Sequence, residues 1–407
     1  MDSLEQLINK HGEPDALIDH WDNNSKKMAI WGFDEILVYD VNGMYHNGKK
    51  ITGDPLRLCN DILNKWDDNS SLVHAIGYIS YDMKNYLFPH LKFKDIPKKP
   101  LIWFGKPKLI AQYQIDTNKK NKQLNNSTLY LEQEIPDINY YRDKIAEIKS
   151  YLKLGETYQI NYSNPIKHSY SKSKFNLYLY LRDIAKPANG MYLNTGKNQF
   201  LSMSPEKFFE IKNNKISTYP IKGTIKRSQN TIKDNKLRIQ LKNSEKDKAE
   251  HLMIVDLLRN DLGKICKYGS IEVNKLYNIK SFETIHHMET EVSGDLLNNI
   301  NFQDIITALF PSGSITGAPK ERSMEIIDEI ENYNREIYTG SIGYLAKKGY
   351  MNFNVAIRTM SFNKNKGTYP VGGGIVWDST AEGERLEALD KAKIIDNILE
   401  KKIEKYA

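Results

Sequence analysis

Residues 341–362 read SIGYLAKKGYMNFNVAIRTMSF, and this stretch gives the clearest indication of the fold. Two runs of alternating apolar residues flank the tripeptide Lys347-Lys348-Gly349. Such a pattern predicts a β-hairpin that turns at this tripeptide. The next run, TYPVGGGIVW (368–377), predicts a neighbouring strand. The C-terminal part of the chain is therefore expected to contain antiparallel sheet.

Strand and helix patterns alternate along the rest of the chain. Period-two segments predict strands at 35–41, 75–83, 107–115, 208–214, 215–223 and 271–282. Apolar spacings of three and four predict helices at 55–66, 139–156, 244–262 and 381–406. Meanders mixed with helices indicate the α+β class with substantial antiparallel sheet.

The composition is that of an ordinary globular protein, with 407 residues, 40% hydrophobic and 27% charged. The net charge of +7 is spread among interleaved acids, which argues against a nucleic-acid partner. Cys59 and Cys266 form neither a CxxC motif nor a disulfide framework, as expected in a reducing cytoplasm. The N-terminal residues lack the apolar core of a signal peptide, and no apolar run approaches the roughly 18 residues needed to span a membrane. We expect a soluble, cytoplasmic protein.

Two acidic helices carry the first candidate site. Asp247 and Glu250 are three residues apart on one predicted helix, and Glu384, Glu387 and Lys391 share a face of the C-terminal helix. Two pairs of carboxylates on facing helices suit Mg²⁺, which prefers oxygen ligands. The alternative is that both pairs are solvated faces of surface helices.

Two small-residue segments are candidates for ligand contact. In GSITGAPKERSMEII (313–327), Pro319 predicts a helix start whose free amides attract an anion, with help from the hydroxyls of Ser314 and Thr316. A plain N-terminal cap without a ligand is equally open. In VGGGIVWDS (371–379), three glycines weaken a strand unless something must approach its backbone closely, or unless they form a bulge.

Single residues complete the candidates. Lys222 is the one charged residue in YPIKGT (219–224). Arg358 is predicted mid-strand among apolar neighbours, where its guanidinium needs a carboxylate partner from the protein or from a ligand. His287 is able to donate a proton near neutral pH, although a lone histidine is more often structural. Tyr338 is likewise more often a packing residue. The chain contains no nucleotide-binding, HExxH or Ser-His-Asp signature.

Taken together and in this order, the motifs resemble those of the chorismate-utilising enzymes. The matching segments are GETYQINYS, SMSPEKFFEI, YPIKGT, EKDKAEHLMIVDLLRNDLG, FPSGSITGAPK, YTGSIGY, NVAIRTM and GGGIVWDS. The resemblance implies large antiparallel β-sheets packed as a sandwich with helices on the outside. It also implies an N-terminal α/β region (1–128) that ends in the polar linker 116–128, and a chorismate-binding catalytic region (129–407) packed with it as one unit.

Two positions indicate the branch of the family. Isochorismate and salicylate synthases carry a general-base lysine where this chain has Gln159. Anthranilate synthase large subunits usually read PIAGT where this chain reads PIKGT, and a lysine there is typical of aminodeoxychorismate synthase component I. The resemblance therefore implies conversion of chorismate and ammonia to 4-amino-4-deoxychorismate, with anthranilate synthase component I as the alternative. A third hypothesis, a basic nucleic-acid-binding scaffold that has lost the chemistry, conflicts with the dispersed charge.

The resemblance also implies a role for each site residue. Lys222 is the nucleophile, Glu206 assists it, and His287 handles a proton near the departing hydroxyl. Glu250 and Glu387 bind Mg²⁺, and Asp247 and Glu384 hold waters bound to the ion. The substrate is held by Ser314, Thr316, Tyr338, Arg358, Lys391 and the backbone of Gly374. Since the chain has no GxCxG cysteine, a separate glutamine amidotransferase subunit is expected to supply ammonia.

Overall fold

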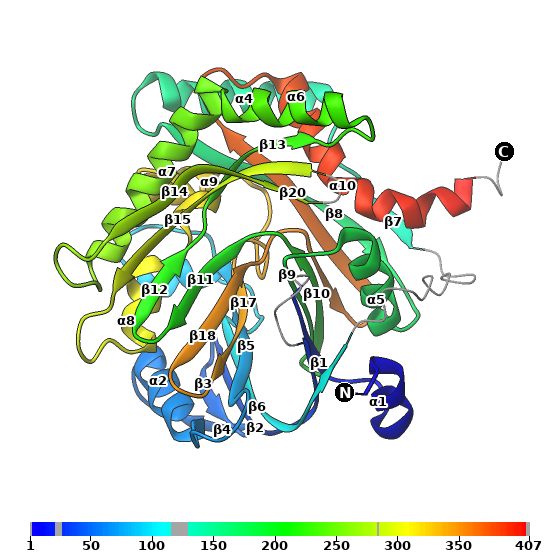
Figure 1. Ribbon diagram of the computed structural model, residues 1–407, viewed down its shortest axis with the longest axis vertical. Coiled ribbons are helices and arrows are strands. Elements are labelled where there is room, and N and C mark those ends of the chain that lie inside the picture. The colour runs from blue at the N-terminus through cyan, green and yellow to red at the C-terminus, as the bar shows by residue number, and fades with distance from the viewer. Residues whose placement is uncertain (1, 21–26, 115–128, 283–284, 404–407) are drawn as a thin grey trace.

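The computed structural model describes residues 2–20, 27–114, 129–282 and 285–403 (Figure 1). Its strands pair into one connected antiparallel sheet that folds into two facing halves, called the first and the second sheet below, and the helices lie outside them (Figure 1). The expected α+β sandwich is confirmed.

The first sheet contains six strands in antiparallel order. They are β8 (Gln159–Ser169), β20 (Lys366–Ile375), β19 (Thr359–Asn363), β10 (Asn198–Ser204), β9 (Asn189–Asn194) and β1 (Ala16–Asp19). Two short strands, β7 (Tyr130–Gln133) and β16 (Gly317–Ala318), pair with the outer edge of β8.

The second sheet is built in the same way. It runs through β5 (Ala75–Ile79), β17 (Ser341–Ala346), β18 (Tyr350–Val355), β11 (Lys207–Lys212), β12 (Lys215–Thr218) and β15 (Ile285–Asp295). Strand β15 also pairs with β13 (Ile221–Lys226) and β14 (Glu272–Ser281). The long strand β2 (Lys27–Asp40) joins the sheets, because it pairs with β1 and with β6 (Ile102–Tyr113), which pairs with β5. Strands β3 (Gly43–His46) and β4 (Lys49–Ile51) extend β2.

Three apolar clusters hold these layers together. The cluster between the sheets includes Ile18, Met191, Phe200, Ile342 and Tyr344. A second cluster packs α4 (Ile138–Lys153), α5 (Lys174–Ala185) and α10 (Ala381–Ile403) on the outer face of the first sheet. A third packs α2 (Pro55–Trp66), α7 (Glu245–Gly263) and α8 (Phe302–Leu309) on the second. The other helices are α1 (Leu4–His11), α3 (Lys84–Leu87), α6 (Thr231–Lys242) and α9 (Lys320–Ile330).

The hairpin predicted at 341–362 is confirmed in its first part. Strands β17 and β18 pair, and Lys348 and Gly349 in the turn have left-handed φ values of 63° and 66°. The chain then leaves the second sheet at residues 356–358 and enters β19 in the first. Arg358 lies in this link with φ 49°, so its predicted mid-strand position is wrong. Its apolar neighbours continue the strand pattern although the strand has ended.

Two other strand predictions are too long. The predicted strand 75–83 ends at Ile79, and a 3₁₀ turn, Tyr81–Met83, follows. The predicted strand 215–223 is divided into β12 and β13, because Pro220 has no N–H to donate to the ladder. The predicted helices are present as α2, α4, α7 and α10. The predicted linker 116–128 lies outside the described residues.

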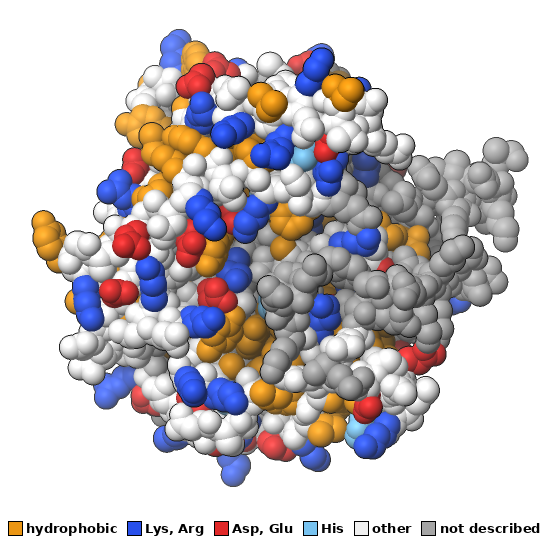
Figure 2. All heavy atoms as spheres, viewed as in Figure 1, with side chains coloured by type: hydrophobic (Ala, Val, Ile, Leu, Met, Phe, Trp, Pro, Cys, Tyr) orange, Lys and Arg blue, Asp and Glu red, His pale blue; other side chains and the backbone are white. Residues whose placement is uncertain are grey.

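Strands from both sides of residue 128 share each sheet: β1 pairs with β9, and β5 pairs with β17. Across the described parts of the chain, no helix combines the length and the apolar character needed to cross a bilayer. On the face seen in Figure 2, basic side chains are scattered among acidic and apolar ones.

Candidate active site

The candidate site lies where the chain passes between the two sheets. Pro205 and Glu206 connect β10 in the first sheet to β11 in the second, and the link that ends at Arg358 leads back from β18 to β19. Backbone bonds hold both links: Val355 N donates to Glu206 O at 3.0 Å, and Met203 N donates to Arg358 O at 3.1 Å. Strands β8, β13 and β20 and helices α7 and α10 supply most of the remaining side chains.

Lys222, on β13, reaches across to the first sheet. Its Nζ donates a hydrogen bond to Oε1 of Gln159 on β8 at 3.1 Å. A Cβ atom built on Gly374 of β20 would lie 2.9 Å from the same Nζ. The glycine therefore leaves room for the lysine, and three strands meet at the ammonium group.

The charges around Lys222 come from the predicted site residues. Burial lowers the pKa of Lys222, and the carboxylates of Glu250, Glu206 and Glu387 act in the opposite direction. The net direction is downward, which favours the neutral amine. The charges of Glu206 and of one carboxylate from each acidic helix therefore all act on the ammonium group of Lys222.

The two acidic helices face each other across this space. Burial raises the pKa of Glu250, and the neighbouring carboxylates of Asp247 and Glu387 raise it further. Burial likewise raises the pKa of Glu384, and so does Glu387. Burial also pushes the pKa of Glu387 upward, but its ion pair with Lys391 outweighs this, and the result is a lowered pKa. Glu250, Glu384 and Glu387 therefore act on one another, although 52% of the Glu387 side chain is exposed and only 20% of the Glu250 side chain.

The glycine run of β20 is a place of close approach rather than a bulge. Its pairing with β8 is continuous from Lys366 to Ile375. A Cβ on Gly372 would lie 2.1 Å from the carbonyl oxygen of Tyr162, and one on Gly373 would lie 3.1 Å from Glu384 and 3.2 Å from Glu387. Gly373 thus leaves space on the side of the acidic helix, and Gly374 leaves space on the side of Lys222.

Glu206 is buried and bonded to the turn at 313–315. Ser314 Oγ donates to Glu206 Oε1 at 2.6 Å, and the Oγ atoms of Ser312 and Ser314 lie 3.0 Å apart. Burial raises the pKa of Glu206 to about 7, although the hydrogen bond from Ser314 and the charge of Lys222 oppose this. A carboxyl group that titrates near neutrality is suited to accept and return a proton.

His287 is buried on β15, opposite β13. Its neighbour in the ladder is Thr224, and Met288 is opposite Lys222. Nε2 of His287 has no hydrogen-bond partner among the described residues, and the nearest carboxylate oxygen, on Glu289, is 3.7 Å away. The ring of Phe282 lies against it with centroids 4.6 Å apart. A buried imidazole nitrogen without a partner is available to a bound ligand.

Two cations border the site in different ways. Lys391 Nζ donates to the carbonyl of Gly372 at 2.6 Å and to Glu387 Oε1 at 2.5 Å, so it ties α10 to the glycine strand. The half-buried Arg358 has no ion pair or side-chain hydrogen bond within the described parts of the chain. Its guanidinium is left without the carboxylate partner that its position calls for.

Two predicted contact residues are buried, and their contact with a substrate stays a prediction. Thr316 is fully buried, and its hydroxyl donates to the carbonyls of Ser312 and Gly313 at 3.1 and 3.4 Å. Tyr338 is buried beside the guanidinium of Arg335, and burial raises its pKa. Thr316 therefore holds the turn that carries Ser314, and Tyr338 packs beside Arg335.

No pattern in the sequence indicated the buried ion pair between Arg335 and Glu331. Arg335 and Glu331 are both buried, and Nη2 of Arg335 lies 2.7 Å from Oε1 of Glu331. Arg335 also donates to the carbonyl of Ile315 at 3.1 Å and to that of Asn161 at 2.5 Å. The pair thus links the turn that carries Ser314 to the strand that carries Gln159.

His251 was also missed, although it follows Glu250 in the sequence. It is buried, and its Nε2 lies 2.7 Å from Thr290 Oγ1. Burial, together with the charge of Lys222, lowers its pKa to about 4. A neutral histidine here connects helix α7 to strand β15.

The carboxylates are suited to a divalent cation but would supply only some of its ligands. Glu250 and Glu387 repel each other, and the missing side chain of Gly373 leaves space beside Glu384 and Glu387. Among the described residues, no three His, Cys, Asp or Glu side chains are grouped as a metal site. Mg²⁺ commonly takes one or two protein carboxylates and completes its shell with water and substrate oxygens.

Comparison with known proteins shows the family of this chain. The profile of the chorismate binding enzymes matches residues 21–397. The chain therefore belongs to the chorismate binding enzyme family.

Individual relatives refine the comparison. The chain is 40% identical over 261 residues to aminodeoxychorismate synthase component 1 of Escherichia coli K12, a match that covers 64% of this chain and 58% of that protein. It is 32% identical to anthranilate synthase component 1 of Saccharolobus solfataricus, and this match covers 88% of both chains. The chain thus spans less than two thirds of the length of the first of these relatives.

Solved structures show the same fold. Anthranilate synthase component I from Streptococcus pneumoniae superposes with a TM-score of 0.79 at 26% identity, covering 91% of this chain and 92% of that one. The menaquinone-specific isochorismate synthase of Escherichia coli superposes with a TM-score of 0.75 at 18% identity, covering 98% and 91%. The second likeness shows the fold alone.

Proposed function

We propose that this protein is an aminodeoxychorismate synthase component I, which converts chorismate and ammonia to 4-amino-4-deoxychorismate. The observation that carries the proposal is the position of Lys222. Its Nζ lies against Gln159 and Gly374, and the carboxylates of α7, of α10 and of Glu206 surround it. Four of the relatives compared with the chain bear the aminodeoxychorismate synthase component 1 name, at 37–40% identity.

In the proposed reaction, Lys222 adds its amine to ring carbon C2 of chorismate. The ring double bonds shift, and the C4 hydroxyl leaves as water once it has been protonated. Ammonia then adds at C4, the double bonds shift back, and the C2–N bond to Lys222 breaks. Covalent catalysis of this kind divides one difficult displacement into two easier steps.

Proton transfers are assigned to two buried groups. Lys222 must lose a proton before it attacks, and we assign its acceptance to the Glu206 carboxylate, whose pKa is about 7 and whose charge acts on Lys222. His287 is proposed to deliver the proton to the departing hydroxyl, since its Nε2 has no hydrogen-bond partner within the described residues. Gln159 holds the Lys222 amine by accepting its hydrogen bond.

The enolpyruvyl carboxylate of the substrate is assigned to Arg358, whose guanidinium has no partner among the described residues. Arg358, with the backbone of Gly374 and with Lys391 nearby, is proposed to bind the enolpyruvyl carboxylate. Glu250 and Glu387 would hold Mg²⁺, and Asp247 and Glu384 would orient waters on it. When bound, the ion would polarise the ring carboxylate and the conjugated system.

A partner and a compartment follow from this proposal. Ammonia would come from a separate glutamine amidotransferase subunit, as the "component 1" in the relatives' names suggests. Cys59 and Cys266 are both free and buried, which suits a reducing compartment such as the cytoplasm.

The test is identification of the product. The purified chain is incubated with chorismate, Mg²⁺ and ammonium, and the products are separated by liquid chromatography with mass detection. The proposal predicts 4-amino-4-deoxychorismate that keeps its enolpyruvyl group. Formation of anthranilate and pyruvate would instead establish an anthranilate synthase, the alternative favoured by the 88% coverage of the Saccharolobus protein.

A further inference from the structure

A buried carboxylate beside His287 has no role in the proposed reaction. Glu289 is two residues further along β15, so the two side chains lie on the same face of the strand. Glu289 is 9% exposed, and His287 is 1% exposed. Oε2 of Glu289 is 3.7 Å from Nε2 of His287, which is too long for a hydrogen bond but close for two opposite charges.

The other oxygen of Glu289 is held by a lysine. Lys280 of β14 lies directly opposite His287 in the ladder, and its Nζ forms an ion pair with Oε1 of Glu289. Since 47% of the Lys280 side chain is exposed, its ammonium group reaches the buried carboxylate from the surface. This ion pair fixes the direction of the carboxylate and leaves Oε2 on the side of the imidazole.

Glu289 is a carboxylate at neutral pH. Burial pushes its pKa upward, but the neighbouring His287 and Lys280 outweigh this effect, and the result is a lowered pKa. When His287 is protonated, this single negative charge therefore lies between two cations.

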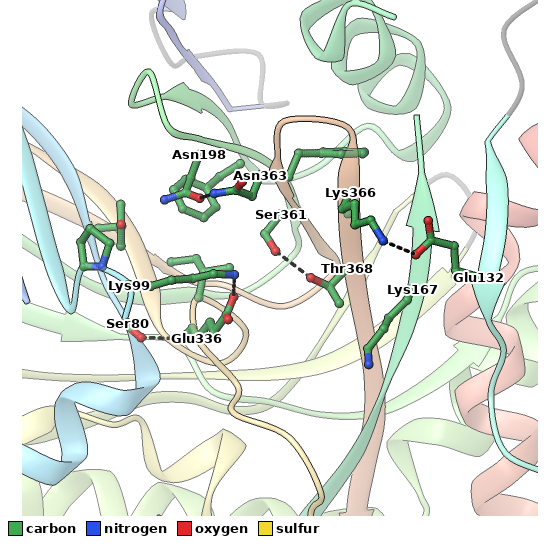
Figure 3. Close-up of a pocket in the computed structure, with 16 residues that line it drawn as sticks. Ser80, Lys99, Glu132, Lys167, Asn198, Glu336, Ser361, Asn363, Lys366 and Thr368 are labelled. Atoms are coloured by element: carbon green, nitrogen blue, oxygen red, sulfur yellow. Dashed lines mark hydrogen bonds and ion pairs between the residues drawn. The ribbon is translucent and has the colours of Figure 1, made fainter. Parts of the chain in front are cut away.

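Two carboxylates of a separate cavity, shown in Figure 3, have one lysine each. Glu336 pairs with Lys99 at 2.6 Å, and Glu132 pairs with Lys366 at 3.7 Å. In contrast, Glu289 faces an ammonium group with one oxygen and an imidazole with the other. Its arrangement is suited to acting on the histidine as well as to neutralising a lysine.

Other titratable groups on this side of β15 respond to Glu289. Burial raises the pKa values of Glu206 and Tyr219, and the charge of Glu289 adds to both effects. On the side of β13, the neighbour of His287 in the ladder is Thr224, which carries no charge. Glu289 is therefore placed between the proposed acid His287 and the proposed base Glu206.

The opposite face of β15 carries separate pairs. His286 Nε2 lies 3.1 Å from Asp234 Oδ1 of α6, and Thr290 Oγ1 lies 2.7 Å from Nε2 of His251 of α7. These groups are behind the strand as seen from His287, and each has its own partner.

A buried histidine that acts as an acid needs a negative charge nearby. Burial disfavours the charged imidazolium, whereas a carboxylate within about 4–6 Å favours it. Glu289 supplies this charge at 3.7 Å without taking the Nε2 proton into a hydrogen bond. The proton therefore remains free to be donated to a substrate.

We propose that Glu289 is a positioning residue for His287: its carboxylate keeps the imidazole protonated, and Lys280 holds that carboxylate in place. The inference rests on the proposed function, in which His287 passes this proton to the C4 hydroxyl and the C4–O bond breaks to release water. The ammonia that then adds at C4 becomes an ammonium group and returns one proton to the neutral imidazole. Glu289 stays a carboxylate throughout.

Proton binding by His287 is measured on the full chain without substrate. The histidine Cε1–H signals are followed by NMR as a function of pH, and the signal of His287 is assigned with His287→Gln. Glu289→Gln should lower the midpoint of its titration by about one pH unit. Lys280→Met should raise the midpoint, because the carboxylate then has the imidazole as its main cation. Lys215→Met, which removes an exposed lysine that pairs with Glu272 at the other end of β14, should leave it unchanged.

The midpoint decides whether Glu289 acts on His287. An unchanged midpoint in Glu289→Gln overturns the proposal. If that variant does not fold, Lys280→Met takes its place, and an unchanged or lowered midpoint there overturns the proposal as well.

Turnover tests what this charge does in the reaction. In Glu289→Gln, the basic limb of the pH–rate profile should move to lower pH with the NMR midpoint, and kcat at pH 8 should fall by about tenfold while the KM for chorismate is unchanged. Glu289→Asp, which keeps the charge, should restore part of the loss. A lower kcat with both limb and midpoint unmoved would show a merely structural role and overturn the proposal. A midpoint that moves without the limb would keep Glu289 as the partner of His287 and contradict the acid role of His287 in the proposed function.

Discussion

The amine of Lys222 and the carboxamide of Gln159 are joined by a hydrogen bond of 3.1 Å, although strands β13 and β8 do not pair with each other. Gln159 is fully buried, and its Nε2 has no partner among the described residues. One end of this amide therefore positions the lysine, and the other end is available to a bound substrate.

The Gln159→Glu substitution tests this arrangement through pH dependence. A carboxylate beside Lys222 favours the ammonium form and raises its pKa, so the neutral amine becomes abundant only at higher pH. We expect the optimum of kcat to move upward and kcat at neutral pH to fall by about tenfold. The measurement is a pH–rate profile of both proteins. An active variant with the wild-type profile would show that Gln159 does not act on the lysine.

The raised pKa of Glu206 predicts the acidic limb of the pH–rate profile of the wild-type protein. Since burial raises its pKa to about 7, the carboxylate that accepts a proton from Lys222 forms only as the pH rises through that value. Glu206→Gln should lower kcat by about 10²–10⁴-fold and remove the limb near pH 7. Persistence of that limb in the variant would assign it to another group.

The same group makes a prediction about stability. The folded-state pKa of Glu206 lies above its ordinary value of 4.5, so the folded protein holds the proton more tightly than the unfolded chain does. The carboxyl group therefore destabilises the fold progressively between about pH 4.5 and 7. The unfolding free energy of Glu206→Gln minus that of the wild type should therefore be larger at pH 8 than at pH 5. Urea denaturation at both pH values measures this difference. A constant difference between the two pH values would contradict the raised pKa.

The acidic helices are tested by titration with Mg²⁺. Glu250→Gln and Glu387→Gln each remove one carboxylate, so the concentration of Mg²⁺ needed for half-maximal activity should rise by about tenfold or more. Glu382→Gln is the matched control, because Glu382 is exposed on the same helix as Glu387 and pairs with Arg142. Unchanged titrations in the first two variants would place the metal elsewhere.

The buried pair of Arg335 and Glu331 is expected to be important for stability as well as for the Ser314 turn. Arg335→Met leaves the Glu331 carboxylate buried without its partner and should cost about 3–5 kcal/mol of unfolding free energy. Adding Glu331→Gln should restore part of this loss, because the uncompensated charge is removed. Denaturant unfolding of Arg335→Met and of the double variant measures both free energies. A double variant less stable than Arg335→Met would contradict this explanation.

Much of the fold could be predicted from local pattern. The hairpin around Lys348 and the helices that carry Glu250 and Glu387 follow from periodicity, which is a property of short windows. Local pattern failed where the chain crosses between sheets, because the apolar residues around Arg358 fit both a strand and a buried link. It also failed at Pro220, where a missing N–H interrupts an otherwise continuous strand pattern.

The site residues, too, could be predicted only in part from the sequence. The spacing of the carboxylates predicted which side chains share a helix face, and the family resemblance pointed to Lys222. Neither predicted that the hydroxyl of Thr316 donates to a carbonyl of its own turn, because that depends on the direction of one side chain. Nor did they predict Arg335, whose partners at Asn161 and Ile315 are distant in the sequence.

The central claim is that Lys222 forms a covalent bond to the substrate ring. The full chain is mixed with chorismate and Mg²⁺ without ammonium, quenched in acid, and analysed by peptide mass spectrometry. We expect the peptide containing Lys222 to gain the mass of chorismate less one water. The modification should be absent in Lys222→Ala, which should lose activity by about a thousandfold or more, and present in Lys226→Ala, which changes an exposed lysine on the same strand. Lys222→Ala that still forms 4-amino-4-deoxychorismate at the wild-type rate would contradict the account.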